Sequence, residues 1–269
     1  MTETLFTFPA IDPVAIALGP VQIRWYALAY VAGLIGGWWV MRRQIRAGQS
    51  VLDNNQLDGL LNACLIGILV GGRLGYVLFY NPAAYLAAPL DILKVWEGGM
   101  SFHGGLAGVI LAILWCARSY RLRALAIGDE VALVAPLGLF FGRLANFING
   151  ELYGRVTDHP LGMVFPGGGP LPRHPSQLYE AALEGLLLFA VRAALARRDA
   201  ILARPGLLSG VFFLGYGLTR SAAEFFRETD AHLGFLMGGA TMGQILSIPM
   251  ILFGAALIRH AQRQPTTHG

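Results

Sequence analysis

Charged residues are scarce in this sequence. Asp, Glu, Lys and Arg together make up 13% of its 269 residues, about half of the roughly 25% that is usual in soluble globular proteins. A soluble domain of this length would need more charge to cover its surface. Hydrophobic residues make up 55% of the chain, and its mean hydropathy is +0.55. The composition therefore excludes a disordered chain and predicts an integral membrane protein.

Cysteine is scarce as well, and the chain has only Cys64 and Cys116. Both lie in apolar runs, so we expect two buried small hydrophobic side chains and neither a disulfide nor a metal site. The sequence has no phosphate-binding loop, nucleotide fingerprint or metal-ligand motif. We therefore expect no metal ion and no cofactor.

Glycine is abundant by contrast, with 35 residues, and glycine lets membrane helices pack closely. A transmembrane helix needs about 20 mainly apolar residues. Such runs cover residues 21–41, 58–79, 100–117, 128–148, 176–196, 206–226 and 242–259. The sequence therefore predicts an all-α integral membrane protein with about seven transmembrane helices, organised as a single domain over residues 1–269. The N-terminal stretch lacks the basic start of a cleavable signal peptide, so we expect the first span to be retained.

The net charge of +4 is explained by where the basic residues lie. If the linkers alternate between the two sides of a membrane, one side receives twelve basic residues and the other five. The side rich in arginine is expected to be cytoplasmic. This places the N-terminus and the linkers 80–99 and 149–175 outside, and the C-terminus in the cytoplasm. The basic surplus thus indicates topology, and a nucleic-acid partner is not expected.

Three arginines that belong to neither side, Arg73, Arg143 and Arg220, fall within the predicted apolar runs. An ionised arginine near the bilayer centre costs about 2.5 to 3.5 kcal/mol, so such residues usually pair or line a polar cavity. For Arg73, near the outer end of its span, the favoured interpretation is a side chain that snorkels to the membrane surface. Arg220 has Glu224 four residues later on the same helix face, which fits a structural ion pair as well as it fits a functional site.

The densest polar segment is GRLANFINGELYGR, residues 142–155, which contains Arg143, Asn146, Glu151 and Gly154. A guanidinium offers forked donors that match a phosphate, and asparagine adds neutral donors. An ordinary polar helix end would account for one or two of these residues but not for all of them. We interpret the segment as part of a binding site.

Further polar groups flank other spans on the same predicted side. The string WEGGMSFHGGLAG places His103 between glycine pairs that include Gly98 and Gly104. A lone histidine is more often structural than catalytic, but the glycines leave space beside its ring. The string LPRHPSQLYEAALEG adds His174 before the fifth span, and Tyr26 begins the first. Together these groups predict a polar cavity that opens toward the outer leaflet and suits an anionic head group.

The strings WEGGMSFHGG, GRLANFINGELYGR, LPRHPSQLYEAALEG, GYGLTRSAAEFFRE and MGQILSIPM closely resemble bacterial prolipoprotein diacylglyceryl transferases, over Tyr26 to Met250. The resemblance implies a multi-pass enzyme of the bacterial inner membrane with seven transmembrane helices. Such an enzyme moves the diacylglyceryl group of phosphatidylglycerol to the lipobox cysteine of a prolipoprotein signal peptide and releases glycerol 1-phosphate. The linker 157–173 is shorter than in some members, and its role stays open.

The resemblance also implies roles for individual residues, carried over by motif. Residues of the signature segment and of the first and third spans would bind phosphatidylglycerol: Tyr26, Gly98, Gly104, Arg143, Asn146, Glu151 and Gly154. His103 matches the family's essential histidine region. His174 falls on the HPSQ string, and Tyr216, Arg220 and Glu224 match a polar row in the sixth helix, in supporting positions.

The chemistry that this site would need follows from the reaction. A thiol with a pKa near 8.5 must lose its proton before it attacks carbon efficiently. Negative charge then grows on the departing phosphate, where Arg143 and Arg220 would stabilise it. His103 is the leading candidate for general base, although a thiol pKa lowered by arginine would make a base dispensable.

Two other classes of protein stay open at this stage. A transporter would also place Arg and Glu inside spans, but the two halves of the chain show no corresponding broken helices. An intramembrane serine protease would need a motif such as G-x-S-x-G, which the sequence lacks.

Overall fold

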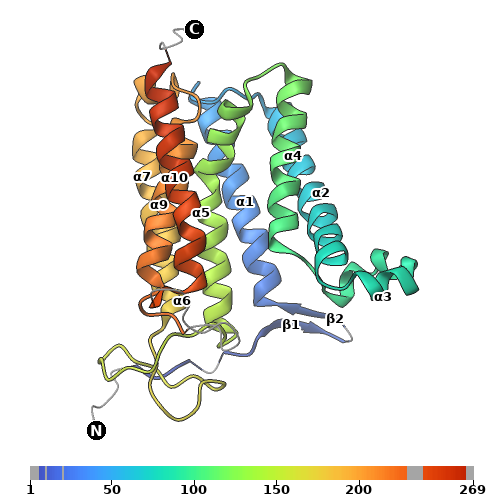
Figure 1. Cartoon of the computed structure of the whole chain (residues 1–269), viewed down its shortest axis with the longest axis vertical. Helices are drawn as coiled ribbons and strands as arrows, with labels where there is room; N and C mark the ends of the chain where they lie inside the picture. Colours follow the sequence, from blue (N-terminus) through green and yellow to red (C-terminus); the bar gives the residue numbers. More distant parts are fainter. Residues whose placement is uncertain (1–5, 10, 20, 229–238, 265–269) are drawn as a thin grey trace. The chain divides into compact units, whose positions relative to one another are not determined.

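The computed structural model describes residues 6–9, 11–19, 21–228 and 239–264. The chain is mostly helical (Figure 1). It divides into two compact units, each described by itself below. The first unit comprises Met1–Val40 and Asp129–Gly269, and the second comprises Met41–Gly128.

Each predicted apolar run overlaps a helical segment. The elements are α1 (Trp25–Arg46), α2 (Asn54–Phe79), α4 (Phe102–Tyr120), α5 (Ala124–Ile148), α9 (Leu207–Ala223) and α10 (Met242–Arg263), with a stretch of α6 (Ser176–Glu180), the π-helical η3 (Ala181–Leu187) and α7 (Leu188–Leu195). Among the described residues, α2, α4, α5 and α10 are long and apolar enough to cross a membrane. Crossing by the other helices stays a prediction.

A β-hairpin precedes the first helix and corrects the all-α prediction. Strand β1 (Val14–Leu18) pairs antiparallel with β2 (Val21–Arg24), and Leu18 lies opposite Val21. Valine and isoleucine recur in both strands and favour extended backbone, while Gly19 takes a positive φ of 59° between them. Helix α1 therefore begins at Trp25 and not at residue 21, because β-branched residues pair as strands before the helical run starts.

Helices α2 and α4 of the second unit pack through a glycine seam. The seam consists of Gly67, Gly71 and Gly75 on α2 and of Gly104 and Gly108 on α4. A Cβ atom at Gly108 would collide with the backbone carbonyl of Gly67, and one at Gly104 would collide with that of Gly71. Small residues spaced by four bring two membrane helices into backbone contact, which strengthens dispersion attraction in lipid.

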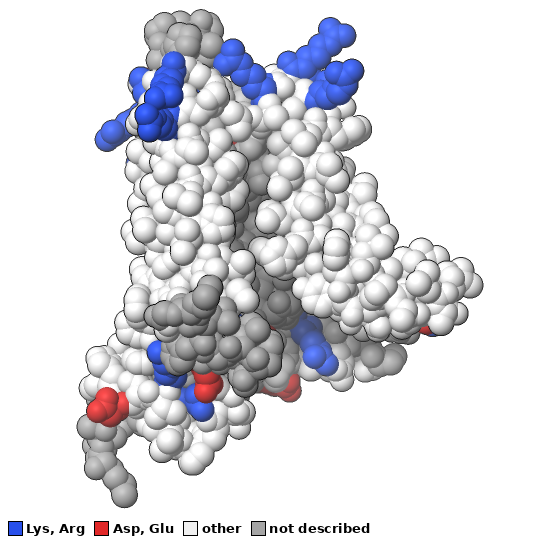
Figure 2. Space-filling view, viewed as in Figure 1, with Lys and Arg blue, Asp and Glu red and all other residues white. Residues whose placement is uncertain are grey.

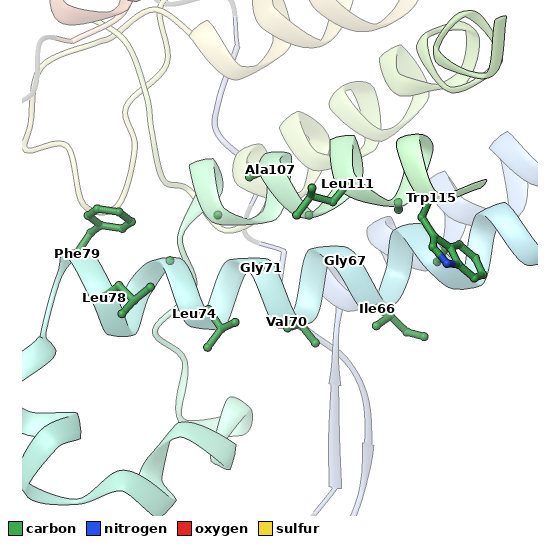
Figure 3. A pocket seen from close by; sticks show the side chains of 15 residues that line it. Ile66, Gly67, Val70, Gly71, Leu74, Leu78, Phe79, Ala107, Leu111 and Trp115 are labelled. Carbon is green, nitrogen blue, oxygen red and sulfur yellow. The ribbon is translucent and has the colours of Figure 1, made fainter. Parts of the chain in front are cut away.

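An apolar groove of about 590 Å³ follows this seam. The seam glycines line it, together with apolar side chains that Figure 3 shows along both helices, among them Val70, Leu74 and Leu78 on α2 and Leu111 and Trp115 on α4. Because the lining is apolar, the groove is compatible with lipid around α2 and α4.

Between α2 and α4 the second unit carries a short irregular segment. It contains α3 (Pro82–Ala87) and two 3-10 turns, η1 (Pro89–Leu93) and η2 (Val95–Glu97). Gly98 and Gly99 follow with positive φ angles of 86° and 73°. Ser101 then caps α4, since its side chain accepts a hydrogen bond from the backbone of Gly104.

In the first unit, α9 packs against α10 and α7. Asp129 of α5 forms hydrogen bonds with the N-terminal end of α9. The Asp129 carboxylate accepts hydrogen bonds from the backbone of Gly206 at 2.8 Å and from the backbone and hydroxyl of Ser209, each at 2.6 Å. These donors include backbone groups at the start of α9 that lack partners within the helix. The fully buried Arg192 of α7 donates to the carbonyl of Asp129 at 3.2 Å, so three helices meet here.

Basic residues recur in the last turns of several helices. Arg43 and Arg46 lie in the last turn of α1, Arg118 in that of α4 and Arg263 in that of α10. In Figure 2 the blue side chains gather near the helix ends, and the visible surface between the two ends carries none. This distribution is the one that a multi-pass membrane protein requires.

The glycine seam can be tested by Gly108→Ala. The added methyl group meets backbone that cannot move aside, so α2 and α4 must separate, at a cost of about 1 to 3 kcal/mol. We expect a lower melting temperature in detergent. Gly138→Ala on α5 is the matched control, because its added Cβ would meet nothing within 4 Å. Equal melting temperatures for wild type and Gly108→Ala would contradict close contact at the seam.

Candidate active site

Six charged side chains form a buried charge cluster in the first unit. They come from α5, from α6 and the following η3, and from α9 with the residues just after it. The members are Arg143, Glu180, Glu184, Arg220, Glu224 and Arg227. Three positive and three negative groups balance within the cluster, which is the condition under which charges are tolerated away from water.

Glu180 is the centre of the cluster. Its side chain is 0% exposed, and it contacts three guanidinium groups. Its Oε2 lies 2.9 Å from Nε of Arg143, and its Oε1 lies 2.7 Å from Nη1 of Arg220 and 3.3 Å from Nη1 of Arg227. One carboxylate thus ties α5 and α9 to α6.

Glu184 adds a second fully buried carboxylate on the π-helical turn. Its Oε2 accepts from Nη2 of Arg143 at 3.3 Å, and its Oε1 lies 3.8 Å from Nη1 of Arg220. Gly185 follows it directly against α5, where an added Cβ would lie 2.6 Å from Cβ of Phe140. A π-helical turn is rare and frequently occurs at functional sites. Here it carries Glu184 and directly follows Glu180, and both carboxylates face the same arginines.

Glu224 pairs with Arg220 as the spacing of four residues predicts, and it lies 3.8 Å from Nε of Arg227. The carboxylates therefore contact only part of each central guanidinium. In the described part of the chain, the recorded partners of Arg143 are at Nε and Nη2, and those of Arg220 are at Nη1 and Nη2. Within the described residues, Nη1 of Arg143 and Nε of Arg220 donate no hydrogen bond. Both side chains keep some exposure, 17% and 14%.

The end of α5 and the loop after it form a neighbouring polar group. The side chains of Asn146 and Asn149 donate to Oε1 of Glu151 at 2.8 and 3.3 Å. Gln177 at the start of α6 donates to the Glu151 carbonyl at 2.6 Å. Among the described residues the partners of the Glu151 carboxylate are thus amides. Glu151 does not orient an arginine here, in contrast to Glu224.

Gly154 is buried where three segments meet. Its amide donates to the carbonyl of His174 at 2.8 Å, and it forms an isolated β-bridge with Arg227. An added Cβ would collide with the carbonyl of Phe226 and lie 2.8 Å from Cβ of His174. Only glycine permits this close backbone approach. The structure therefore gives Gly154 a packing role that links the 149–155 loop to the end of α9.

Two tyrosines that the sequence analysis singled out also belong to the first unit. Tyr26 lies on α1, and its hydroxyl is 3.3 Å from that of Tyr30. Tyr216 lies on α9, the helix that also carries Arg220 of the cluster.

His174 lies outside the helices, just before α6. Its Nδ1 is 3.3 Å from the hydroxyl of Tyr179, and its ring contacts that of Phe226 edge to face at 5.2 Å. Burial lowers the pKa of His174 below its ordinary value, and the nearby His159 lowers it further. A histidine with a lowered pKa is neutral at pH 7, which fits a supporting role at a backbone junction.

The second unit carries Gly98, His103 and Gly104. His103 lies in the first turn of α4 with an exposed side chain, and its ring meets that of Phe102 at 5.7 Å. Gly104 belongs to the glycine seam, and Gly98 ends the 3-10 turns. The interpretation of Arg73 as a snorkelling side chain is wrong. Its side chain is buried and donates to backbone carbonyls, because the irregular segment after α3 folds over it.

Glu184 and Arg227 were not predicted as site residues, and Glu180 was included only as one polar residue of the string LPRHPSQLYEAALEG, with no role of its own. Two carboxylates four residues apart inside an apolar run were the available signal, since such residues are rare in spans and usually have partners. The partner itself could not be read, because Glu184 and Arg143 are 41 residues apart.

The long apolar helices define a multi-pass membrane protein, and a buried charge cluster lies between helices of its first unit. The chain matches the family described as prolipoprotein diacylglyceryl transferase over residues 13–260. It is 60% identical over 258 residues to phosphatidylglycerol-prolipoprotein diacylglyceryl transferase of Rhodospirillum rubrum, covering 95% of this chain and 94% of that one. Proteins with the same name are 55% identical in Paramagnetospirillum magneticum, with 96% of each chain covered, and 56% identical in Azospirillum brasilense, with 96% and 97% covered. The chain belongs to the prolipoprotein diacylglyceryl transferase family.

The lowered pKa of His174 predicts how stability depends on pH. The unfolded chain binds a proton at this histidine near its ordinary pKa of about 6.5, and the folded chain does so only at lower pH. Stability is therefore lost as pH falls through 6.5 toward the folded pKa. We expect the melting temperature of His174→Phe to fall less than that of wild type between pH 7.5 and pH 5. The exposed His260→Phe is the control and should follow wild type. Identical profiles for wild type and His174→Phe would contradict the lowered pKa.

Proposed function

We propose that this chain transfers the diacylglyceryl group of phosphatidylglycerol to the lipobox cysteine thiol of prolipoproteins and releases glycerol 1-phosphate. The observation that carries this proposal is the buried charge cluster, in which Arg143 and Arg220 keep donors available for a phosphate. The names of relatives at 55 to 60% identity support the choice of substrates.

The reaction is a substitution at the glyceryl carbon that bears the phosphate ester. The thiolate sulfur forms a bond to this carbon, the carbon–oxygen bond breaks, and its electron pair leaves with the phosphate oxygen. Arg143 and Arg220 stabilise the charge that grows there, and Asn146 adds a neutral donor. Because phosphate is itself a good leaving group, the proposal includes no cofactor or metal ion.

The three carboxylates orient the guanidinium groups. Glu180 and Glu184 hold Arg143 along one edge, and Glu180 with Glu224 holds Arg220. Guanidinium groups held in advance need little reorganisation when charge develops, which makes their stabilisation larger than that of mobile side chains. Tyr26, Glu151 and Gly154 complete the phosphatidylglycerol site, and Tyr216 and His174 support it.

His103 is the general base in this proposal and takes the thiol proton, while Gly98, where an added Cβ would meet nothing within 4 Å, leaves room for the lipid. The space at Gly104 is taken by the contact with Gly71 of α2. The alternative is a thiol whose pKa is lowered by the arginines, so that no base is required. The two alternatives differ in the expected effect of replacing His103.

The proposed membrane arrangement has seven transmembrane helices in the bacterial inner membrane. The N-terminus faces outward, the C-terminus faces the cytoplasm, and the polar cavity opens toward the outer leaflet. The arginines in the last turns of α1, α4 and α10 support this orientation. The lipobox cysteine of the prolipoprotein would reach the site at the outer face.

The test is incubation of the purified protein with phosphatidylglycerol and a lipobox peptide, followed by mass spectrometry. We expect a mass gain of one diacylglyceryl group on the peptide, and none on a peptide with serine in place of the cysteine. Arg143→Ala should abolish transfer, because the buried carboxylates lose a partner and the phosphate loses a donor. The exposed Arg197→Ala is the control and should stay active. Cleaved peptide, or transfer by Arg143→Ala at a normal rate, would contradict the proposal.

The base is tested separately by His103→Gln, which keeps a polar side chain of similar size. If His103 takes the thiol proton, the transfer rate at pH 7 should fall by roughly 100-fold or more. Part of the loss should be recovered at higher pH, where more thiolate forms without a base. A loss that is small at every pH would instead support a thiol activated by the arginines.

A further inference from the structure

Arg73 on α2 is bound in an unusual way. Its side chain is only 4% exposed, and its guanidinium donates five hydrogen bonds to main-chain carbonyls. The acceptors are the carbonyls of Asp91 at 2.5 Å, Ile92 at 2.9 Å, Lys94 at 3.2 Å, Gly98 at 2.6 Å and Gly99 at 3.3 Å. The guanidinium also lies 5.1 Å from the ring centroid of Tyr85.

These five bonds saturate the side chain, because a guanidinium has five N–H donors and no acceptor. Arg73 therefore keeps no donor for a phosphate, whereas Arg143 and Arg220 do. Its charge is solvated by backbone dipoles of its own unit. Arg73 therefore stabilises the backbone segment from Asp91 to Gly99 and does not bind the lipid directly.

The bound segment needs such a partner. It consists of two short 3-10 turns followed by two glycines with positive φ, a geometry that leaves carbonyls without helical partners. Gly99 is also required for the contact, because a Cβ there would lie 2.8 Å from Nη1 of Arg73 and 2.8 Å from the ring of Tyr76. Arg73 thus sets the path of the chain as far as Gly99.

Arg73 and the adjacent Gly72 on α2 hold the backbone that leads from Asp91 to the start of α4, where His103 lies. The amide of Ser101 donates to the carbonyl of Gly72 at 2.8 Å, and the Ser101 hydroxyl accepts from the amide of Gly104 at 3.2 Å. His103 lies between these two contacts, in the first turn of α4. Arg73 and Gly72 therefore fix the start of α4, which is the turn that carries His103.

We propose that Arg73 is a positioning residue for transfer, which holds the loop from Gly98 to Ser101 so that His103 faces the reacting thiol. This inference rests on the proposed function. A lysine keeps the charge but has three donors from one nitrogen, so it cannot bind carbonyls on both sides of the loop. Charge alone is not sufficient, and the forked shape of arginine is the property that this position uses.

The decisive experiment combines Arg73→Lys with His103→Gln. Displacement of a catalytic group by about 1 Å can cost roughly 100-fold in rate, so we expect Arg73→Lys to lose about that much with little change in KM for phosphatidylglycerol. If Arg73 acts through His103, the double variant should be no more than about twofold slower than His103→Gln alone. Arg118→Lys, at an exposed arginine of the same unit, is the control and should keep the wild-type rate.

A second readout does not depend on activity. Hydrogen exchange at the amides of residues 91–101 should speed up in Arg73→Lys, while exchange in α9 stays unchanged. If Arg73→Lys does not fold, Gly99→Ala serves instead, because its methyl group pushes the guanidinium away and leaves the charge in place. Gly99→Ala should give the same loss of rate and the same faster exchange.

The outcomes separate the inference from the proposed function. Losses that multiply in the double variant, a normal rate in Arg73→Lys, or unchanged exchange at residues 91–101 would overturn the positioning role. Lack of transfer by the wild-type protein would overturn the proposed function, and the exchange measurement would still show whether Arg73 holds the loop.

Discussion

The contact of Glu180 with three arginines is the interaction on which the first unit depends. A carboxylate with no exposed surface is tolerable only because Arg143, Arg220 and Arg227 surround it. Removing one partner of a buried pair costs about 3 to 5 kcal/mol, since the other charge is left without compensation. α5, α6 and α9 are therefore held in one arrangement, and the π-helical turn brings Glu184 to the same two central arginines.

Arginine is used in two different ways in this chain. In the charge cluster of the first unit, carboxylates contact the central guanidinium groups of Arg143 and Arg220. In the second unit, Arg73 gives every donor to backbone carbonyls and shapes a loop. Both uses require the planar, forked geometry of the side chain, which lysine lacks. This difference explains how a chain with so few charges assigns one residue type to both chemistry and architecture.

Local patterns in the sequence predicted the helices and one part of the site. The spacing of Arg220 and Glu224 was sufficient to predict their ion pair, and the polar segment 142–155 stood out against an apolar background. The hairpin at residues 14–24 was missed, because its β-branched residues extend an apolar run when hydropathy alone is read. Strand pairing there depends on a turn at Gly19 and not on average composition.

Long-range partners were beyond the reach of sequence reasoning for a physical reason. Arg220 meets Glu180 across 40 residues of chain, and no periodicity within one helix encodes such a contact. The acceptors of Arg73 are harder still to foresee, since every residue carries a carbonyl and only the fold decides which ones are left without partners. The roles of Tyr26, His103 and Gly98 in transfer stay predictions that the experiments above address.

The order of the cluster along the chain has a consequence for biogenesis. Arg143 is synthesised before Glu180 and Glu184, so α5 enters the bilayer with a cation whose partners have not yet emerged from the ribosome. An unpaired arginine in a span costs about 2.5 to 3.5 kcal/mol. Glu180 and Glu184 add a similar cost to α6 and η3 until they pair with Arg143. Arg143 offsets only one of the two glutamates, and Arg220 of α9 supplies the second positive charge. Full pairing of these groups therefore requires α5, α6, η3 and α9 to be present together.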